Sequence, residues 1–211
     1  MIEGIFVEGL IFSIMVLGIL ISYRILDMAD MTCDGAIATG AAVCTMCIVN
    51  GQGILVGMIL AFLCCIVCGL VTAAIHNKLH VPVLLAGILT QTMLYSINLR
   101  ILGNKANVPL VRVDTLYRLF PKVFTFVPPA VASLLGSFVA VVLLKCALDA
   151  FFRTDLGVAL GAMGGNEQVV VSQGMNPNIL KYIGLGVGNG IIGISGAHCH
   201  PLHQVQRRGL F

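Results

Sequence analysis

The stretch "FFRTDLGVALGAMGGNEQVV", Phe151–Val170, separates two long apolar runs of the chain. Thr154 is a favoured N-cap residue, and Asp155 falls in the first turn, where the helix dipole favours an anion. Apolar residues then recur at the spacing of one helix face; they are Leu156, Ala159, Leu160 and Met163. The stretch therefore predicts a short amphipathic helix that lies outside the bilayer, between two membrane spans.

The predicted helix ends at Gly164, Gly165 and Asn166, residue types that tolerate left-handed backbone geometry. A helix of about two and a half turns is marginal in water by itself. Its apolar face must therefore pack on its own bundle, on the membrane interface or in the groove of a partner protein. The residues alone leave these three alternatives open.

The composition excludes an ordinary soluble domain. Of 211 residues, 58% are hydrophobic and 10% are charged, and the mean hydropathy is +1.01, whereas soluble domains carry about 25% charged residues. The class that fits is an all-α bundle of transmembrane helices. The net charge of +3 is scattered, so no nucleic-acid surface is indicated. Met1-Ile2-Glu3 lacks a positive leader, so the first apolar run is interpreted as a retained span.

About six segments approach the length of roughly 20 apolar residues that a span needs. They are Ile5–Tyr23, Thr32–Val49, Ile54–Ile75, Val81–Ile101, Phe126–Leu148 and Ile179–Ser195. Residues 1–197 are thus predicted to form one transmembrane domain. The polar residues between Asn104 and Thr125 predict an extramembrane loop, and "HNKLH" (His76–His80) predicts a polar turn.

The second segment, "TCDGAIATGAAVCTMCIV", is a poor lipid-facing helix because it contains Asp34, Gly35 and Gly40. Irregular backbone at membrane depth is tolerated only against protein or a water-filled cavity. The segment is either a broken or inward-facing helix beside a solute path, or a helix capped just outside the membrane. The fourth segment carries amide and hydroxyl groups that need partners or a polar path. On polarity alone, the candidate path residues are Asp34, Gly35, Gly40, Ser96 and Asn98.

Other motifs favour packing over chemistry. The pairs Cys44-x-x-Cys47 and Cys65-x-x-Cys68 have redox or metal spacing, but they lie in apolar runs where cysteine acts as a small hydrophobe. "GLGVGNG" (Gly184–Gly190) follows no predicted strand, so its small residues favour close helix packing. No metal site and no catalytic residue is assigned. An intramembrane enzyme is the alternative, with Asp34, Glu8 and the cysteines as its candidates.

The stretch "FRTDLGVALGAMGGNEQVVVSQGMNPN" resembles the coupling segment of permease subunits in bacterial ABC importers of the branched-chain amino acid/ribose type. That pattern is T-x-x-G-x-A-L-R-A-x-G-x-N, followed by G-[IM]-N, which Gly174-Met175-Asn176 matches. "YRILDMADMTCDGAIATGAAV" (Tyr23–Val43) resembles the family element R-I-x-D-L-[ST]-x-[DE]-G. "LLAGILTQTMLYSINLRILGNKANVPL" (Leu84–Leu110) resembles permeases related to tryptophan/tyrosine uptake systems. The resemblance covers about residues 5–196.

The resemblance implies a multi-pass protein of the cell inner membrane whose coupling helix docks on a cytosolic ABC ATPase. The residues it assigns to coupling are Thr154, Asp155, Leu156, Gly157, Ala159, Leu160, Ala162, Gly164 and Asn166. It implies two permease copies in contact with lipid, an extracytoplasmic solute-binding protein, and a small solute such as an amino acid. ATP belongs to the partner, and this chain has no G-x-x-x-x-G-K-[ST] and no cofactor.

The resemblance also implies an orientation that charge does not decide. If the coupling loop is inside, five basic residues fall on each side of the membrane. Those inside are Arg24, Lys78, Lys145, Arg153 and Lys181, and those outside are Arg100, Lys105, Arg112, Arg118 and Lys122. The positive-inside rule is therefore balanced. The resemblance places the coupling loop inside and the N-terminus outside.

Two departures from the family pattern are expected to matter. Gly161 stands where the pattern has arginine, and glycine inside a helix costs about 1 kcal/mol relative to alanine. From His198 the chain reads "HCHPLHQVQRRGLF", whereas the family continues with A-Q-x-x-G and further spans. Residues 198–211 are therefore predicted to be an atypical polar tail from a frameshift or early stop. The alternative function is a truncated permease or assembly subunit without transport activity.

Overall fold

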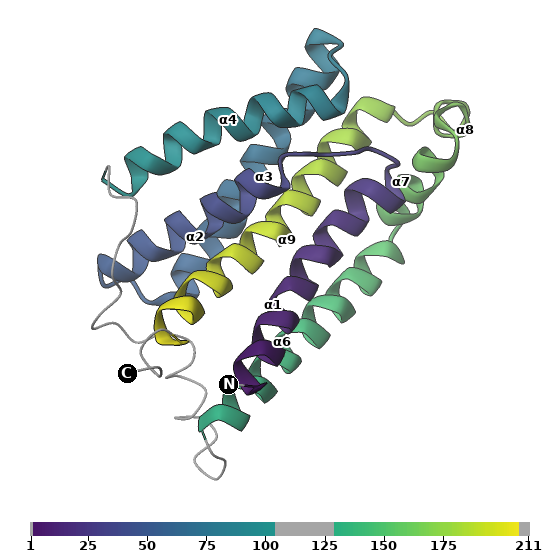
Figure 1. Ribbon diagram of the computed structural model, residues 1–211. Helices are drawn as coiled ribbons and strands as arrows, with labels where there is room; N and C mark the ends of the chain where they lie inside the picture. Colours follow the sequence, from purple (N-terminus) through teal and green to yellow (C-terminus); the bar gives the residue numbers. More distant parts are fainter. Residues whose placement is uncertain (1, 104–128, 207–211) are drawn as a thin grey trace.

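The structure, a computed structural model, describes residues 2–103 and 129–206, and every regular element within these ranges is a helix (Figure 1). The elements are α1 (Ile2–Leu20), the π-helix η1 (Ile21–Ile25), α2 (Cys33–Val49), α3 (Ile54–Leu79), α4 (Val83–Ile101), α6 (Pro129–Phe152), α7 (Asp155–Gly165), α8 (Glu167–Ser172) and α9 (Pro177–Gln206). The predicted all-α bundle is confirmed. The predicted loop between Asn104 and Thr125 lies outside the described residues.

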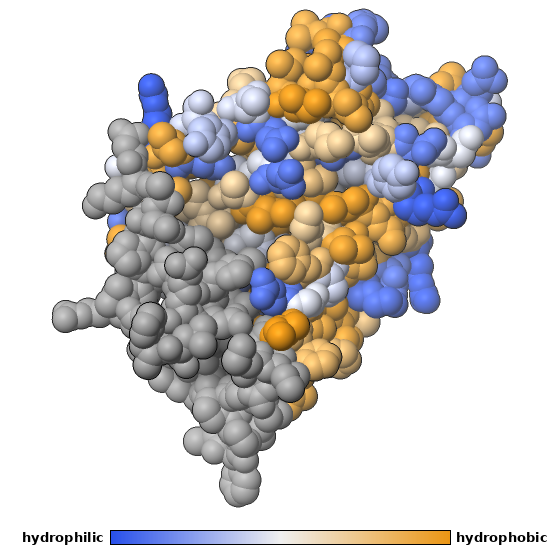
Figure 2. All heavy atoms as spheres, in the orientation of Figure 1, coloured by the Kyte–Doolittle hydropathy of each residue, from blue (hydrophilic) through white to orange (hydrophobic). Residues whose placement is uncertain are grey.

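Four helices within these ranges are long and apolar enough to cross a membrane. They span Ile5–Ile25, Ile54–Leu79, Leu134–Phe152 and Pro177–His198. Helix α2 is apolar but has 17 residues, and α4 has 19 residues that include several polar side chains. On the face drawn in Figure 2, hydrophilic residues gather toward the side where α8 lies. The crossings by α2 and α4 remain a prediction.

Helix α9 is the central element of the bundle. It packs along α1, α2 and α3 (Figure 1), and 67% of its candidate span is buried, compared with 33% for the spans of α1 and α3. Its polar Ser195 donates a hydrogen bond to the carbonyl oxygen of Ile11, 2.9 Å away, on α1. Helix α9 is therefore surrounded mostly by protein, whereas α1 and α3 also leave large apolar side chains exposed.

Glycines bring α9 close to its neighbours. A Cβ added at Gly40 of α2 would overlap the carbonyl group of Gly193 on α9. A Cβ at Gly188 would lie 2.9 Å from the hydroxyl of Ser22, and one at Gly190 would lie 2.8 Å from the ring of Phe62. Because apolar surface gains little by leaving lipid, small residues that allow close backbone contact are what favour helix association in membranes. The predicted packing role of Gly184–Gly190 is thus supported.

The connection between α1 and α2 is irregular but tied to the bundle. After η1, the backbone N–H of Met28 donates to the carbonyl oxygen of Ser22 at 2.9 Å. Asp30 accepts two hydrogen bonds, from the backbone N–H of Thr32 at 2.8 Å and from Nδ2 of Asn189 on α9 at 2.7 Å. The irregular backbone of this connection therefore lies against protein, as irregular backbone at membrane depth requires.

Three buried threonines join the start of α2 to α3 and α4. The hydroxyls of Thr32 and Thr72 are 2.9 Å apart, and Thr72 donates to Thr90 at 3.0 Å. Thr90 in turn donates to the carbonyl oxygen of Ala86, one turn earlier in α4, at 3.0 Å. Thr32 is the N-cap residue of α2, but its hydroxyl makes this interhelical contact and no cap bond. Helix α2 is continuous through Asp34, Gly35 and Gly40, so the prediction of a broken helix is wrong. Where α2 starts relative to the membrane stays a prediction.

Several predicted boundaries were too short. Helix α3 continues through most of "HNKLH" and turns at His80, whose φ of 54° is left-handed. The turn is supported by a 2.7 Å hydrogen bond between Nδ1 of His76 and the carbonyl oxygen of Val81. Helix α9 extends to Gln206 rather than ending near Ser195. Polar residues extend these helices beyond the apolar runs because a helix does not need apolar residues to continue.

The Gly40–Gly193 contact predicts a large difference between two glycine-to-alanine variants. We expect Gly40→Ala to lower the free energy of unfolding by about 1–3 kcal/mol, because a methyl group there overlaps backbone that has no room to shift. Gly9→Ala is the matched control, since a Cβ at Gly9 meets nothing within 4 Å. Thermal unfolding in one detergent compares them; equal melting temperatures would contradict the close contact.

Candidate functional site

Helix α7 begins as the sequence predicts. Thr154 has extended backbone (φ −77°, ψ 159°), and its Oγ1 accepts a hydrogen bond from the backbone N–H of Gly157 at 3.4 Å. The same hydroxyl donates to the carbonyl oxygen of Phe151 at 2.5 Å, so it ties the new helix to the end of α6. Asp155 occupies the first turn. The side-chain cap and the preceding helix end together determine where α7 starts.

The predicted left-handed end of α7 is wrong. Asn166 has φ −161° and ψ 110°, which is extended backbone, and its Oδ1 accepts from the backbone N–H of Gln168 at 2.9 Å. Asn166 therefore caps a further helix, α8, and an N-cap needs extended rather than left-handed geometry. The left-handed turn comes later, at Gly174 (φ 78°), in the matched Gly174-Met175-Asn176 segment.

The inner face of α7 is anchored in the hydrophobic core. Ala159, Leu160 and Met163 are 3%, 0% and 6% exposed, in one cluster with residues of α1, α6 and α9. Gly157 and Gly164 share this side: a Cβ at Gly157 would overlap the backbone of Phe152, and one at Gly164 would overlap the carbonyl oxygen of Ile25. For this face, the packing partner is the chain's own bundle.

The outer face of α7 is open. Leu156 and Val158 are 48% and 63% exposed, and a Cβ at Gly161 meets nothing within 4 Å. Asp155 and Gly165 are also exposed. Leu156 and Leu160, expected to act together on a partner, thus differ: Leu160 is enclosed in its own chain. Leu156 lies one turn earlier, beyond the edge of the core, and its side chain stays exposed to a partner.

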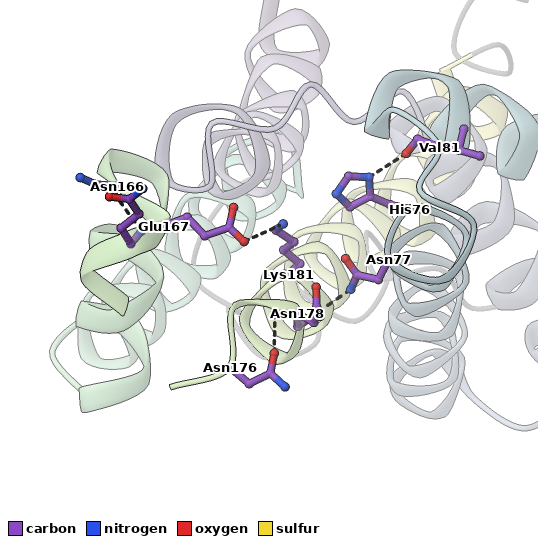
Figure 3. Close-up of polar contacts among 9 residues, drawn as sticks. His76, Asn77, Val81, Asn166, Glu167, Asn176, Asn178 and Lys181 are labelled. Atoms are coloured by element: carbon purple, nitrogen blue, oxygen red, sulfur yellow. Dashed lines mark hydrogen bonds and ion pairs between the residues drawn. The ribbon is translucent and has the colours of Figure 1, made fainter. Parts of the chain in front are cut away.

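Helix α8 links α7 to the start of α9 (Figure 1). Its Val170 is fully buried in the same core. Glu167 forms an ion pair with Lys181 of α9, with Oε1 and Nζ 3.2 Å apart (Figure 3). Asn77 of α3 donates to the carbonyl oxygen of Asn178 at 3.3 Å. The sequence analysis missed α8 because it has six residues rich in valine, a weak helix former. The sequence signal that predicts α8 is Asn166 followed by the acid Glu167, which is a typical helix start.

A separate groove lies between α2 and α4. Its cavity volume is about 410 Å³. It is lined by Asp34, Gly35 and Ala38 of α2 and by Ile88, Gln91, Thr92, Tyr95 and Asn98 of α4. Of the predicted path residues, the structure therefore brings Asp34, Gly35 and Asn98 together. Gly40 faces Gly193 instead, and Ser96 is exposed away from the groove.

Asn98 is unusual among the groove residues because its amide is buried. The residue is 6% exposed, and neither Oδ1 nor Nδ2 has a hydrogen-bond partner among the residues that the structure describes. A buried polar group without a partner costs about 1–3 kcal/mol. Hence the Asn98 amide has unused capacity both to donate and to accept.

The cysteine pairs pack as small apolar side chains. Cys44 and Cys65 are 1% and 0% exposed, and Sγ of Cys65 donates to the carbonyl oxygen of Ala36 at 3.3 Å. Cys65 also lies against Gly193 of α9. Within the described ranges, no group of three or more His, Cys, Asp or Glu residues is arranged to hold a metal ion.

The described residues thus form apolar helices around a glycine-rich central helix, with a capped helix between two of them. Residues 1–207 match the family described as "Branched-chain amino acid transport system / permease component". The chain belongs to this permease family. It is therefore a multi-pass membrane protein of a transport family rather than of an enzyme class. The match also covers the beginning of the segment predicted as an atypical tail.

Two relatives extend this finding. The chain is 40% identical over 190 residues to a tyrosine transport system permease protein of Clostridioides difficile (strain R20291), covering 90% of this chain and 61% of the relative. It is 30% identical over 189 residues to an uncharacterised protein of Rickettsia prowazekii (strain Madrid E), covering 90% and 64%. The chain thus spans less than two thirds of the length of either relative. No solved structure matches it.

The two faces of α7 predict opposite effects of added side chains. We expect Gly161→Ala to raise the free energy of unfolding by up to about 1 kcal/mol, because position 161 is open and alanine favours the helix. Gly164→Ala should instead destabilise the protein, since the methyl group meets the carbonyl oxygen of Ile25. Thermal unfolding of both variants tests this; destabilisation by Gly161→Ala would show that the outer face is covered.

Proposed function

We propose that the chain is the permease subunit of an ATP-binding-cassette importer in the cell inner membrane. In this role it forms the translocation path for a small solute and couples it to a cytosolic ATPase through residues 151–166. The observation that carries the proposal is α7, a capped helix between the candidate spans Leu134–Phe152 and Pro177–His198. One face of α7 is held by the bundle and the other is open to a partner.

The predicted coupling residues divide into two groups by burial. Gly157, Ala159, Leu160 and Gly164 hold α7 against the bundle, whereas Thr154 and Asn166 cap α7 and α8. Of the predicted residues, Asp155 and Leu156 remain for the ATPase surface; Val158 and Gly161, which the family pattern did not assign, lie on the same open side. Ala162 is half-buried between the two groups. Most motif positions thus position the helix, and a smaller set makes the contact.

The anchored inner face supports transmission of force. Because Leu160 and Gly164 contact the core and the end of η1, a displacement of α7 also displaces the inner end of α1. The Glu167–Lys181 ion pair and buried Val170 connect the same unit to α9. Movement of a docked ATPase would therefore reach the central helix directly.

The remaining partners follow from the family. A second permease copy would complete the path, and an extracytoplasmic solute-binding protein would deliver the solute. ATP would bind to the ATPase subunit and not to this chain. With α7 inside, the N-terminus of α1 lies outside.

We propose that the transported solute is an amino acid. The Clostridioides difficile relative is a tyrosine transport system permease protein, and the α2–α4 groove offers this chain's grouped polar side chains Asp34, Gln91 and Asn98. The apolar residues Ala38 and Ile88 also line the groove and suit the side chain of such a solute.

Substitutions on the outer face of α7 test whether this helix docks on the ATPase. We expect Leu156→Glu with Val158→Glu to reduce the amount of ABC ATPase recovered with the tagged chain from native membranes at least tenfold, because two exposed apolar contacts become charged. Quantitative mass spectrometry of Walker A-containing subunits measures the recovery. ATP-driven uptake of tyrosine by the reconstituted complex should fall in parallel.

The matched control is Val49→Glu with Leu55→Glu, which places the same two charges on side chains that are 49% and 64% exposed. Leu55 lies in the first turn of α3. Val49 ends α2, beside Ile48, which packs with Ala197 near the far end of α9 from α7. Its ATPase recovery should equal that of the wild type. If the Leu156 and Val158 variant retains full recovery, α7 is not the docking helix.

A further inference from the structure

The α2–α4 groove has polar groups at two ends and a mainly apolar middle. Gly35 packs against Gln91, since a Cβ at Gly35 would lie 3.3 Å from Cα of Gln91. Asp34 therefore lies at the Gln91 end. Asn98 follows Gln91 by seven residues, which is about 10 Å along the axis of α4. The backbones at the two ends are thus separated along α4 by somewhat more than the length of an extended arylalkylamine, which leaves room for a side chain to contact the ligand at each end.

The Asp34 end suits a cation. Among the described residues that line the groove, Asp34 is the only one with a charged side chain. Gln91 adds an amide at this end, while the hydroxyl of Thr92 is used by its own helix, donating to the carbonyl oxygen of Leu89 at 2.8 Å. A carboxylate beside an apolar wall favours a ligand that carries an ammonium group next to an apolar body.

The Asn98 end suits a neutral group that both donates and accepts. Its two amide atoms lack partners, and leaving them so is unfavourable at 6% exposure. Asn98 lines the groove, so a ligand bound there lies next to this residue. A hydroxyl both donates to Oδ1 and accepts from Nδ2. Tyr95 and Ala38 line the groove between the two ends and can contact an aromatic ring.

We propose that the α2–α4 groove is a solute-binding site for an aromatic amine with a hydroxyl at its far end, and that Asn98 is the residue that selects the hydroxyl. The ammonium group binds at Asp34, the ring lies along Ala38 and Tyr95, and the hydroxyl bonds to the Asn98 amide. This inference rests on the proposed function, because the solute is the one that the permease carries.

Tyrosine and phenylalanine are matched probes, since they differ only in the far hydroxyl. With the full chain in lipid nanodiscs, we expect tyrosine to bind about tenfold more tightly than phenylalanine, the size of one neutral hydrogen bond. Asn98→Leu should bring this ratio to about one. Asp34→Asn should weaken both ligands and leave the ratio unchanged, because it acts on the shared amine.

A third ligand tests the amine contact by itself. 3-(4-Hydroxyphenyl)propionate keeps the ring and hydroxyl but lacks the amine, so the wild type should bind it at least tenfold more weakly than tyrosine. Asp34→Asn should remove most of this preference. If the preference survives Asp34→Asn, Asp34 does not bind the amine and the proposed ligand orientation is wrong.

Asn50→Leu is the control for Asn98→Leu. It makes the same amide-to-apolar change at an exposed residue at the end of α2, outside the groove, and should leave all ratios at wild-type values. Thermal unfolding checks that Asn98→Leu is folded; we expect no loss of stability, because leucine removes an unpartnered amide. Asn98→Gln should retain part of the preference for tyrosine.

The inference is overturned if folded Asn98→Leu keeps the wild-type ratio of tyrosine to phenylalanine, which would mean that water or protein uses the amide. It is also overturned if the wild-type chain binds neither ligand at millimolar concentration. Neither result changes the amount of ABC ATPase expected to co-purify with the chain, because that measurement tests the docking of α7. Conversely, full ATPase recovery with the Leu156→Glu, Val158→Glu variant, together with an intact groove selectivity, would refute the proposed coupling and leave the binding site standing.

Discussion

The close approach of α9 to α2, where Gly40 meets the carbonyl of Gly193, is the constraint on which the bundle depends. Helices in a bilayer gain little from hiding apolar surface, because lipid is as apolar as the protein interior. Contact between backbones therefore has to supply the attraction, and only glycine permits it at this distance. Similar contacts at Gly188 and Gly190 extend along α9 toward α1 and α3. The central position of α9 is a result of these small residues.

The placement of α9 also makes an irregular passage between α1 and α2 possible. Backbone groups outside a helix need partners at membrane depth, and Asp30 provides them by joining the turn at Thr32 to Asn189 of α9. The same passage fixes the end of η1, whose Ile25 carbonyl contacts Gly164. The position of α7 is thus linked to the central helix through the connection that follows α1.

Both candidate sites, the outer face of α7 and the α2–α4 groove, are therefore connected to the same part of the bundle. Helix α7 rests on the end of η1, and α8 is tied to α9 through Glu167 and Lys181. The α2–α4 groove begins close to the same connection, since a Cβ at Gly87 of α4 would lie 2.7 Å from the backbone nitrogen of Met31. The proposed docking surface and the proposed solute groove share these contacts, which would allow them to act together.

The sequence by itself determined what depends on neighbours along the chain. The apolar runs predicted the helices, and Thr154 predicted the start of α7, because capping is a contact within one turn. Which side of each helix is buried was decided by the tertiary structure: Leu160 is enclosed but Leu156 is not, and Asn98 lines the groove while Ser96 is exposed. In a membrane protein, the residues that face lipid and the residues that face protein are both apolar. The sequence pattern therefore does not separate them, and only the packing around α9 does.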